Sequence, residues 1–163
     1  MEIVEFKNAF PKLARRLGAE NTALFVTLMH EREVSAGTIL IEDQVPVSSL
    51  YLVLEGEFRI EVPRIDGQLE IGRIGSGKLI GETALFTEDH LPTSRVIATT
   101  PSRILEIQHA QYWSAWKENP DLASVLTREL VDHMSERVRI ADELINNGLQ
   151  KEVSVHVQPP SQL

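Results

Sequence analysis

The sequence predicts a mainly β domain, a jelly-roll-like β-roll of eight short strands with helices before it and a long helix after it. Apolar residues recur at helical spacing over residues 5–31 and again over residues 108–148. Between residues 34 and 107 the pattern changes to alternation or short apolar runs separated by turn residues. Many short strands in succession are typical of a roll, and 163 residues with 42% hydrophobic content suit one domain, expected over residues 1–148.

Residues 5–31 are expected to form the helices that precede the roll. Phe6, Phe10, Leu13 and Leu17 lie three or four residues apart and so share one face of a helix. Asn21-Thr22 supplies capping residues for a second helix with its own apolar face. We expect both helices to pack beside the roll.

Turn residues divide the next segment into strands. Pro46, Gly56 and Pro101 mark turns, and Asp66-Gly67 is the strongest hairpin signal. Strands are expected at residues 38–41, 50–54, 58–62, 69–74, 95–99 and 104–107. The core is expected to contain Phe58, Ile60, Ile74, Leu85, Val96, Ala98, Ile104 and Ile107.

Four glycines lie within ten residues, at Gly72, Gly75, Gly77 and Gly81, and lead into Glu82. Glycine takes positive φ angles without a Cβ penalty, so this backbone is expected to approach a ligand closely. A phosphate or a ribose is the expected group.

Four short motifs follow one another here: Gly75-Ser76-Gly77, Ile80-Gly81-Glu82, Ala84-Leu85-Phe86 and Val96-Ile97-Ala98. Together they resemble the phosphate-binding cassette of the cyclic nucleotide-binding domain family, which includes the catabolite activator protein and kinase regulatory subunits. The resemblance covers residues 35–145 and implies a β-roll with a ligand pocket, in which Glu82 accepts a hydrogen bond from a ribose hydroxyl. It places in that pocket Gly81, Glu82, Thr83, Ala84, Leu85, Pro92, Thr93 and Ser94.

The chain departs from the family pattern at one charged position. The family has an arginine followed by Ser or Thr and by Ala, and these positions fall on Pro92, Thr93 and Ser94. A guanidinium is well shaped to pair with a phosphate. Removing one partner of a buried charge pair costs about 2–5 kcal/mol, which weakens binding by about thirty-fold to several thousand-fold. We therefore expect a degenerate pocket that binds a cyclic nucleotide weakly at most, and no other cofactor.

Three nearby cations are candidate replacements. Arg95 is expected to point away from the pocket, because alternation along a strand puts it on the opposite face from Ser94. Arg73 and Lys78 flank the glycines and offer a different route to a phosphate.

Gln44 is a second departure from the family pattern, since the family commonly has glycine there. A backbone feature near the ligand is expected to be lost with that glycine.

One long helix is expected over residues 120–147, with Asn119 as its cap and Asn147-Gly148 at its end. A seam on this helix resembles the family's dimer helix and predicts a homodimer through Val131, Met134, Val138, Ala141 and Ile145. The alternative is that the same face packs back on the roll. At the positions of the family's polar base contacts this helix has Arg137 and Val138, so base recognition is not expected.

The tail, residues 149–163, is expected to be flexible, with an edge strand at residues 153–157 as the alternative. After the long helix the sequence leaves no room for a winged helix, a kinase or a channel. The effector is therefore expected to be another protein, which the sequence does not identify.

Composition argues against several classes of function. A net charge of -8 argues against a direct nucleic-acid partner. The chain has no cysteine, and its five histidines are scattered singly, so no metal site is expected. No apolar run approaches about eighteen residues and no signal peptide opens the chain, so we expect no membrane insertion and a cytoplasmic location.

An enzyme is also not expected. Residues 72–78 fit the first seven positions of a P-loop, but Leu79 stands where a Ser or Thr hydroxyl would bind magnesium. No nucleophile elbow is present, and no catalytic residue is expected. Two hypotheses remain: a dimeric protein-protein adaptor with a degenerate pocket, or a working cAMP or cGMP sensor with a non-standard phosphate clamp.

Overall fold

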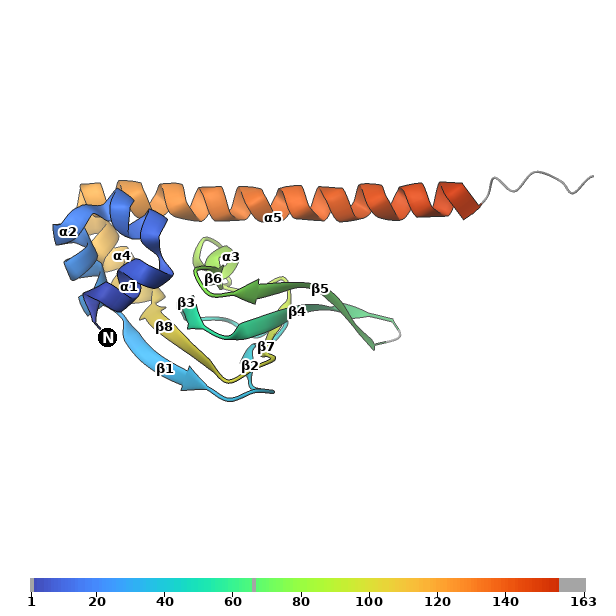
Figure 1. Cartoon of the computed structure of the whole chain (residues 1–163), viewed down its shortest axis with the longest axis horizontal. Coiled ribbons are helices and arrows are strands. Elements are labelled where there is room, and N and C mark those ends of the chain that lie inside the picture. Colours follow the sequence, from blue (N-terminus) through green and yellow to red (C-terminus); the bar gives the residue numbers. More distant parts are fainter. Residues whose placement is uncertain (1, 66, 156–163) are drawn as a thin grey trace, which may run out of the picture.

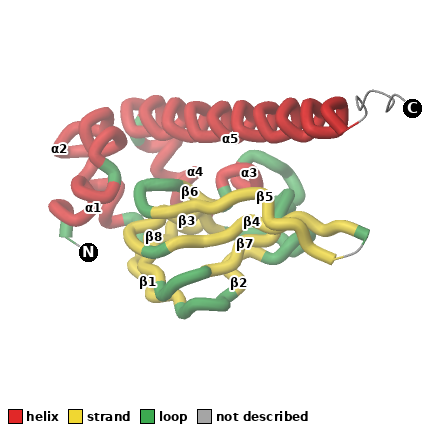
Figure 2. Tube along the Cα trace, turned by 45° about the vertical axis from the view of Figure 1, so that its right-hand side comes forward, coloured by secondary structure: helices red, strands yellow, loops and turns green. Residues whose placement is uncertain are grey.

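The computed structural model describes residues 2–65 and 67–155. In this part of the chain, eight strands form two antiparallel sheets of four. One sheet has the order β1 (His30–Val34), β8 (Ser102–Gln108), β3 (Ser49–Glu55), β6 (Leu79–Ile80). The other has the order β2 (Ile39–Ile41), β7 (Arg95–Ala98), β4 (Glu57–Arg64), β5 (Gly67–Gly75). The sheets fold over a shared core as a roll (Figure 2), which confirms the expected fold class.

Helices cover one end and one side of the roll (Figure 1). The end is covered by α1 (Ile3–Ala9), α2 (Pro11–Thr27) and α4 (His109–Glu118). The single turn α3 (Glu82–Leu85) lies between the roll and the long helix α5 (Pro120–Val155), which passes along the whole side.

The N-terminal helices end earlier than expected. The helical segment breaks at Gly18, where φ is 75°, and stops at Leu28. Residues 30–34 pair with β8, so the roll begins at His30 and not at residue 34. Four of the five β1 residues are exposed, and the strand therefore has no apolar period that the sequence could have shown. Strand β6 also escaped prediction, because it has only two residues.

Strand β3 is buried on both faces and joins two cores. Leu50, Leu52 and Leu54 face the helices, while Tyr51 and Val53 face the interior of the roll. A strand covered on both sides reads as a continuous apolar run, which explains the clear signal at residues 50–54. The eight residues expected in the core are all buried.

Helix α5 is 36 residues long, about 54 Å at 1.5 Å per residue. It does not end at Asn147-Gly148 as expected, but continues to Val155. A glycine inside a helix costs only about 1 kcal/mol relative to alanine, and good helix formers follow it at residues 149–152. The expected flexible tail is therefore helical as far as Val155, and residues 156–163 lie outside the described residues. No described helix is both long enough and apolar enough to cross a bilayer.

One face of α5 docks on the rest of the domain, and the expected seam is on another face. The docked face carries Leu122, Leu126 and Leu130, which are buried. Val131 and Val138 remain 55% and 62% exposed, and Met134 is half-buried. Val131 and Val138 therefore do not pack back on the roll, as the alternative required. The side chains of Ala141 and Ile145 lie outside the described residues.

Candidate functional site

A small pocket lies between the interior of the roll, the loop before β7 and helix α5. Isoleucines from four strands and one valine form its apolar part, and the start of α3, residues 92–94 and α5 form the rest. The residues that line it are Ile41, Ile60, Ile74, Ile80, Gly81, Thr83, Pro92, Thr93, Ser94, Val96 and Arg137. Its volume is about 10 Å³, which is room for one water molecule.

Most of the residues expected at a ligand come together here. Gly81, Thr83, Pro92, Thr93 and Ser94 line the pocket. Ala84 and Leu85 do not, because the single turn of α3 directs them into the two hydrophobic cores. Their side chains are therefore not available to a ligand, and the expected role of their backbone amides stays a prediction.

Gly81 is the residue whose missing side chain shapes the pocket. Its φ is 90°, and a Cβ there would lie 3.0 Å from the carbonyl oxygen of Ser49 and 3.4 Å from Cδ1 of Ile41. Glycine tolerates both the conformation and the close approach. It allows α3 to begin directly at the pocket, with Glu82 as its first residue.

The other three glycines serve the fold. A Cβ at Gly77 would lie 2.9 Å from the carbonyl oxygen of Ala9, so this glycine lets the turn before β6 approach α1. Gly72 and Gly75 belong to β5 and do not line the pocket. Of the four glycines expected near a ligand, only Gly81 lies there.

Glu82 is fully buried and ties α5 to the pocket. Its Oε1 accepts a hydrogen bond from Nη1 of Arg137 in an ion pair, and its Oε2 has no hydrogen-bond partner among the described residues. His133, one turn earlier on α5, places Nε2 3.3 Å from the carbonyl oxygen of Leu79. Burial lowers the pKa of His133, and the nearby Glu82 carboxylate opposes this effect.

Arg137 is the pocket cation that the sequence analysis missed. Among the described residues that line the pocket, it alone carries a charge. From the sequence, Arg137 was placed at a base-contact position of the family, and its ion pair with Glu82 was not predicted. A usable signal exists, because Arg137 follows Leu126, Leu130 and His133 at helical spacing on the docked face of α5. Val138, the other expected base-contact residue, is exposed and does not line the pocket.

The three candidate replacement cations lie outside the pocket. Arg73 forms ion pairs of 2.7 and 2.8 Å with two glutamates of the β4-β5 hairpin, and Lys78 is exposed. Arg95 pairs with Glu42 at 2.8 Å while Ser94 lines the pocket, so the predicted alternation along this strand is confirmed.

Gln44 keeps the backbone feature that was expected to be lost. Its φ is 58°, in the left-handed region where glycine is usual. A side chain in this conformation costs about 1–2 kcal/mol. The chain thus retains the turn after β2, and the left-handed conformation of Gln44 lowers its stability locally.

A buried histidine at the start of α4 should make the free energy of unfolding depend on pH. His109, the first residue of α4, is buried, and neither of its ring nitrogens has a hydrogen-bond partner among the described residues. Its ring centroid lies 5.0 Å from that of His90. Burial, and secondly the charge of His90, lower the pKa of His109. The unfolded chain then binds this proton more readily, so the free energy of unfolding should fall as the pH drops below about 6.5.

Chemical unfolding at about pH 8 and about pH 5.5 tests this expectation in wild type, His109→Leu and His30→Leu. His109→Leu should show a smaller difference between the two pH values than wild type. His30 is exposed, so His30→Leu should keep the wild-type difference. His133 acts in the same direction, so part of the difference should remain in His109→Leu. Equal differences in all three proteins would contradict the assignment to His109.

Comparison with known proteins gives matches across most of this fold. Residues 31–119, more than half of the chain, match the family model described as the cyclic nucleotide-binding domain. The Pycsar effector protein PaPycTIR of Pseudomonas aeruginosa is 28% identical over 125 residues, which are 77% of this chain and 37% of that protein. The CRP-like protein Clp of Xanthomonas oryzae pv. oryzae is 28% identical over 123 residues, which are 74% of this chain and 53% of Clp.

The chain thus spans 37% and 53% of the lengths of these two curated relatives. Among solved structures, a cyclic nucleotide-binding domain from Methylobacillus flagellatus has a TM-score of 0.78 at 16% identity. The match covers 88% of this chain and 84% of that one, and at this identity it concerns the fold alone.

Proposed function

Because the chain belongs to the cyclic nucleotide-binding domain family, we propose that it is a non-enzymatic regulatory module whose pocket is closed and which acts as a homodimeric adaptor for another protein. The observation that carries this proposal is the ion pair between Arg137 and Glu82 at the pocket. The relatives' names, an effector and a CRP-like protein, fit a regulatory role. The cytoplasmic location expected from the sequence stays a prediction.

The closed pocket is unfavourable for a cyclic nucleotide in two ways. Ligand sites for small molecules usually enclose about 300–1,000 Å³, whereas this cavity has about 10 Å³. The pocket's cation is already neutralised by a fully buried carboxylate. A phosphate would have to displace Glu82 from Arg137, and an unpaired buried carboxylate is costly.

Calorimetric titration with cAMP and with cGMP tests the closed pocket. Little or no heat of binding is expected for either nucleotide. Micromolar affinity for either one would reject the adaptor role in its present form.

The second candidate function is a working sensor with Arg137 as a non-standard phosphate clamp. One observation favours it: the buried Oε2 of Glu82 has no hydrogen-bond partner among the described residues and so could accept a bond from a ribose hydroxyl. The phosphate of a nucleotide would then pair with the Arg137 guanidinium in place of Glu82, and α5 would move. Micromolar binding that Arg137→Gln abolishes would identify this function.

The homodimer is expected through the exposed seam of α5. Val131 and Val138 expose apolar surface on one face, with Met134 between them, and the helix extends far beyond its contacts with the other helices (Figure 1). Met134→Glu with Val138→Glu should convert a dimer into a monomer in light scattering, because two charges would face their copies across the seam.

Ile140→Glu is the matched control for this prediction. Ile140 is an exposed apolar residue of the same helix, about 200° around the axis from Val138. It should leave the dimer intact. A wild-type monomer at high concentration, or a dimer that survives the seam charges, would exclude this interface.

A further inference from the structure

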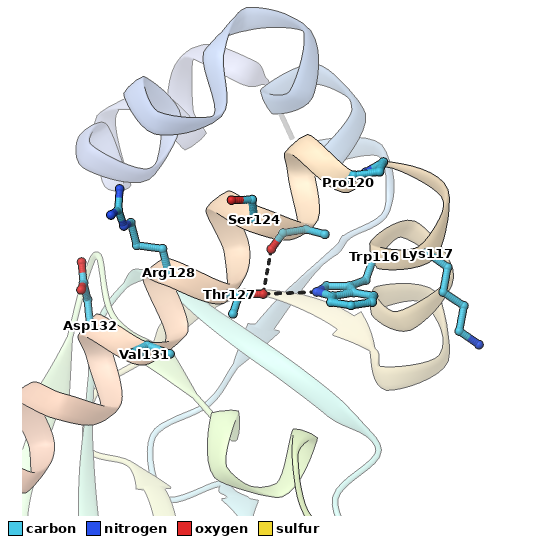
Figure 3. A pocket seen from close by; sticks show the side chains of 9 residues that line it. Trp116, Lys117, Pro120, Ser124, Thr127, Arg128, Val131 and Asp132 are labelled. Carbon is cyan, nitrogen blue, oxygen red and sulfur yellow. Dashed lines mark hydrogen bonds between the residues drawn. The ribbon is translucent and has the colours of Figure 1, made fainter.

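A second and much larger concave site lies away from the pocket, between the end of α4 and the first turns of α5 (Figure 3). This groove has a volume of about 800 Å³. Its lining is mostly apolar and includes Trp116, Pro120, Ala123 and Val131. Lys117 and Arg128 lie on its two sides, as Figure 3 shows.

Trp116 is exposed yet held in one position. It is 40% exposed, and its indole Nε1 donates a 3.2 Å hydrogen bond to Oγ1 of Thr127, whose hydroxyl in turn donates to the carbonyl oxygen of Ala123 (Figure 3). Its ring packs edge-on against Trp113, with centroids 5.8 Å apart. A fixed, accessible tryptophan in a concave site is the kind of residue on which binding energy concentrates in protein interfaces.

The charge of the groove differs from that of the chain as a whole. The chain carries a net charge of -8, but two of the three charged residues that line the groove are cations. Asp132, the third, is paired with Arg16 at 2.9 Å and lies 3.7 Å from Lys12. Within the described residues, Lys117 and Arg128 form no hydrogen bond or ion pair through their side chains. Two accessible cations thus flank an apolar surface on an acidic protein.

We propose that this groove docks an acidic, amphipathic segment of a partner protein. An apolar side chain of the segment packs on Trp116 and Pro120, and its carboxylates pair with Lys117 and Arg128. Elsewhere on an acidic surface such a segment meets like charge, so the groove also supplies specificity. The inference goes beyond the proposed function, because it depends neither on an empty pocket nor on the dimer.

A second copy of the chain fits this groove less well. A two-fold symmetric contact would bring two copies of the same lining together, and its one carboxylate, Asp132, is already paired with Arg16, so Lys117 and Arg128 would find no free carboxylate in that lining. A contact that placed an acidic part of one copy in the groove of the next would not be symmetric, and such contacts extend into rings or filaments. Val131 belongs to both the groove and the proposed seam, but the rest of the groove continues from it towards α4, away from Met134 and Val138.

A random peptide library displayed on phage and selected on the purified chain tests the proposal. The enriched peptides should combine Trp, Phe or Leu with several Asp or Glu residues. A fluorescent copy of an enriched peptide should bind the double variant Lys117→Glu, Arg128→Glu at least about tenfold more weakly than wild type. Trp116→Ala should show a similar loss. The control Lys7→Glu, Arg15→Glu changes the net charge equally at exposed positions on other helices and should keep the wild-type affinity.

Several outcomes would overturn the proposal. These are no enrichment, enrichment of neutral or basic peptides, or equal affinity for the groove variant and the control. If the wild type is a dimer and the groove variant a monomer, the occupant is a second copy. None of these results bears on the nucleotide titration, so the proposal for the groove and the proposal for the closed pocket are tested independently.

Discussion

Arg137→Ala should lower the free energy of unfolding by about 3 kcal/mol, a large effect for one residue of a long helix. The reason is the partner that it leaves behind. Glu82 is fully buried, its Oε2 already lacks a hydrogen-bond partner among the described residues, and Arg137 supplies the bond to Oε1. Breaking a buried ion pair costs about 3–5 kcal/mol, and the lower end applies because the Arg137 side chain is 31% exposed.

Urea unfolding at one protein concentration measures this effect against two matched variants. Arg139→Ala removes the same side chain two residues away, where the ion pairs with Glu136 and Glu143 are exposed and worth about 0–1 kcal/mol. Adding Glu82→Gln to Arg137→Ala removes the buried charge and should recover part of the loss. Equal losses for Arg137→Ala and Arg139→Ala would show that the Glu82 pair does not hold α5 to the pocket.

The elements that were predicted well from the sequence are those whose burial produces a regular pattern of apolar residues. Strand β3 is covered on both faces and reads as an apolar run, whereas β1 is almost entirely exposed, and its first two residues were assigned to the preceding helix. The end of α5 was misplaced for a different reason. Asn147-Gly148 is a common helix stop, but a stop signal only lowers helix stability locally, and the residues that follow favour a helix.

The pocket was predicted less well, because one sequence signal can serve several physical needs. A glycine signals close approach without saying what approaches: for Gly77 it is the backbone of Ala9, and for Gly81 it is the pocket wall. A side chain at Gln44 did not prevent the left-handed turn. The largest omission was Arg137. Its helical spacing puts it on the docked face of α5, but its pairing with Glu82, 55 positions away, depends on how the helix docks.

Pro92→Arg should give the chain measurable affinity for cAMP or cGMP. Pro92 is buried and lines the pocket at the position where the family pattern has arginine. The substitution supplies a cation that Glu82 does not already neutralise, and it restores the backbone N–H that proline lacks. A gain between about thirty-fold and several thousand-fold is expected from the energy of one buried charge pair. Thr87→Arg, at an exposed position in the same loop, should give no gain.

The gain should be only partial while Arg137 closes the pocket, and this separates two causes of weak binding. One cause is the missing cation, and the other is the ion pair that leaves a cavity of about 10 Å³. Adding Arg137→Gln to Pro92→Arg frees the Glu82 carboxylate for a ribose hydroxyl and opens the pocket, so calorimetry should show tighter binding than for Pro92→Arg alone. If the second substitution instead abolishes the binding that Pro92→Arg created, Arg137 contacts the phosphate itself, and the sensor replaces the adaptor as the function of this domain.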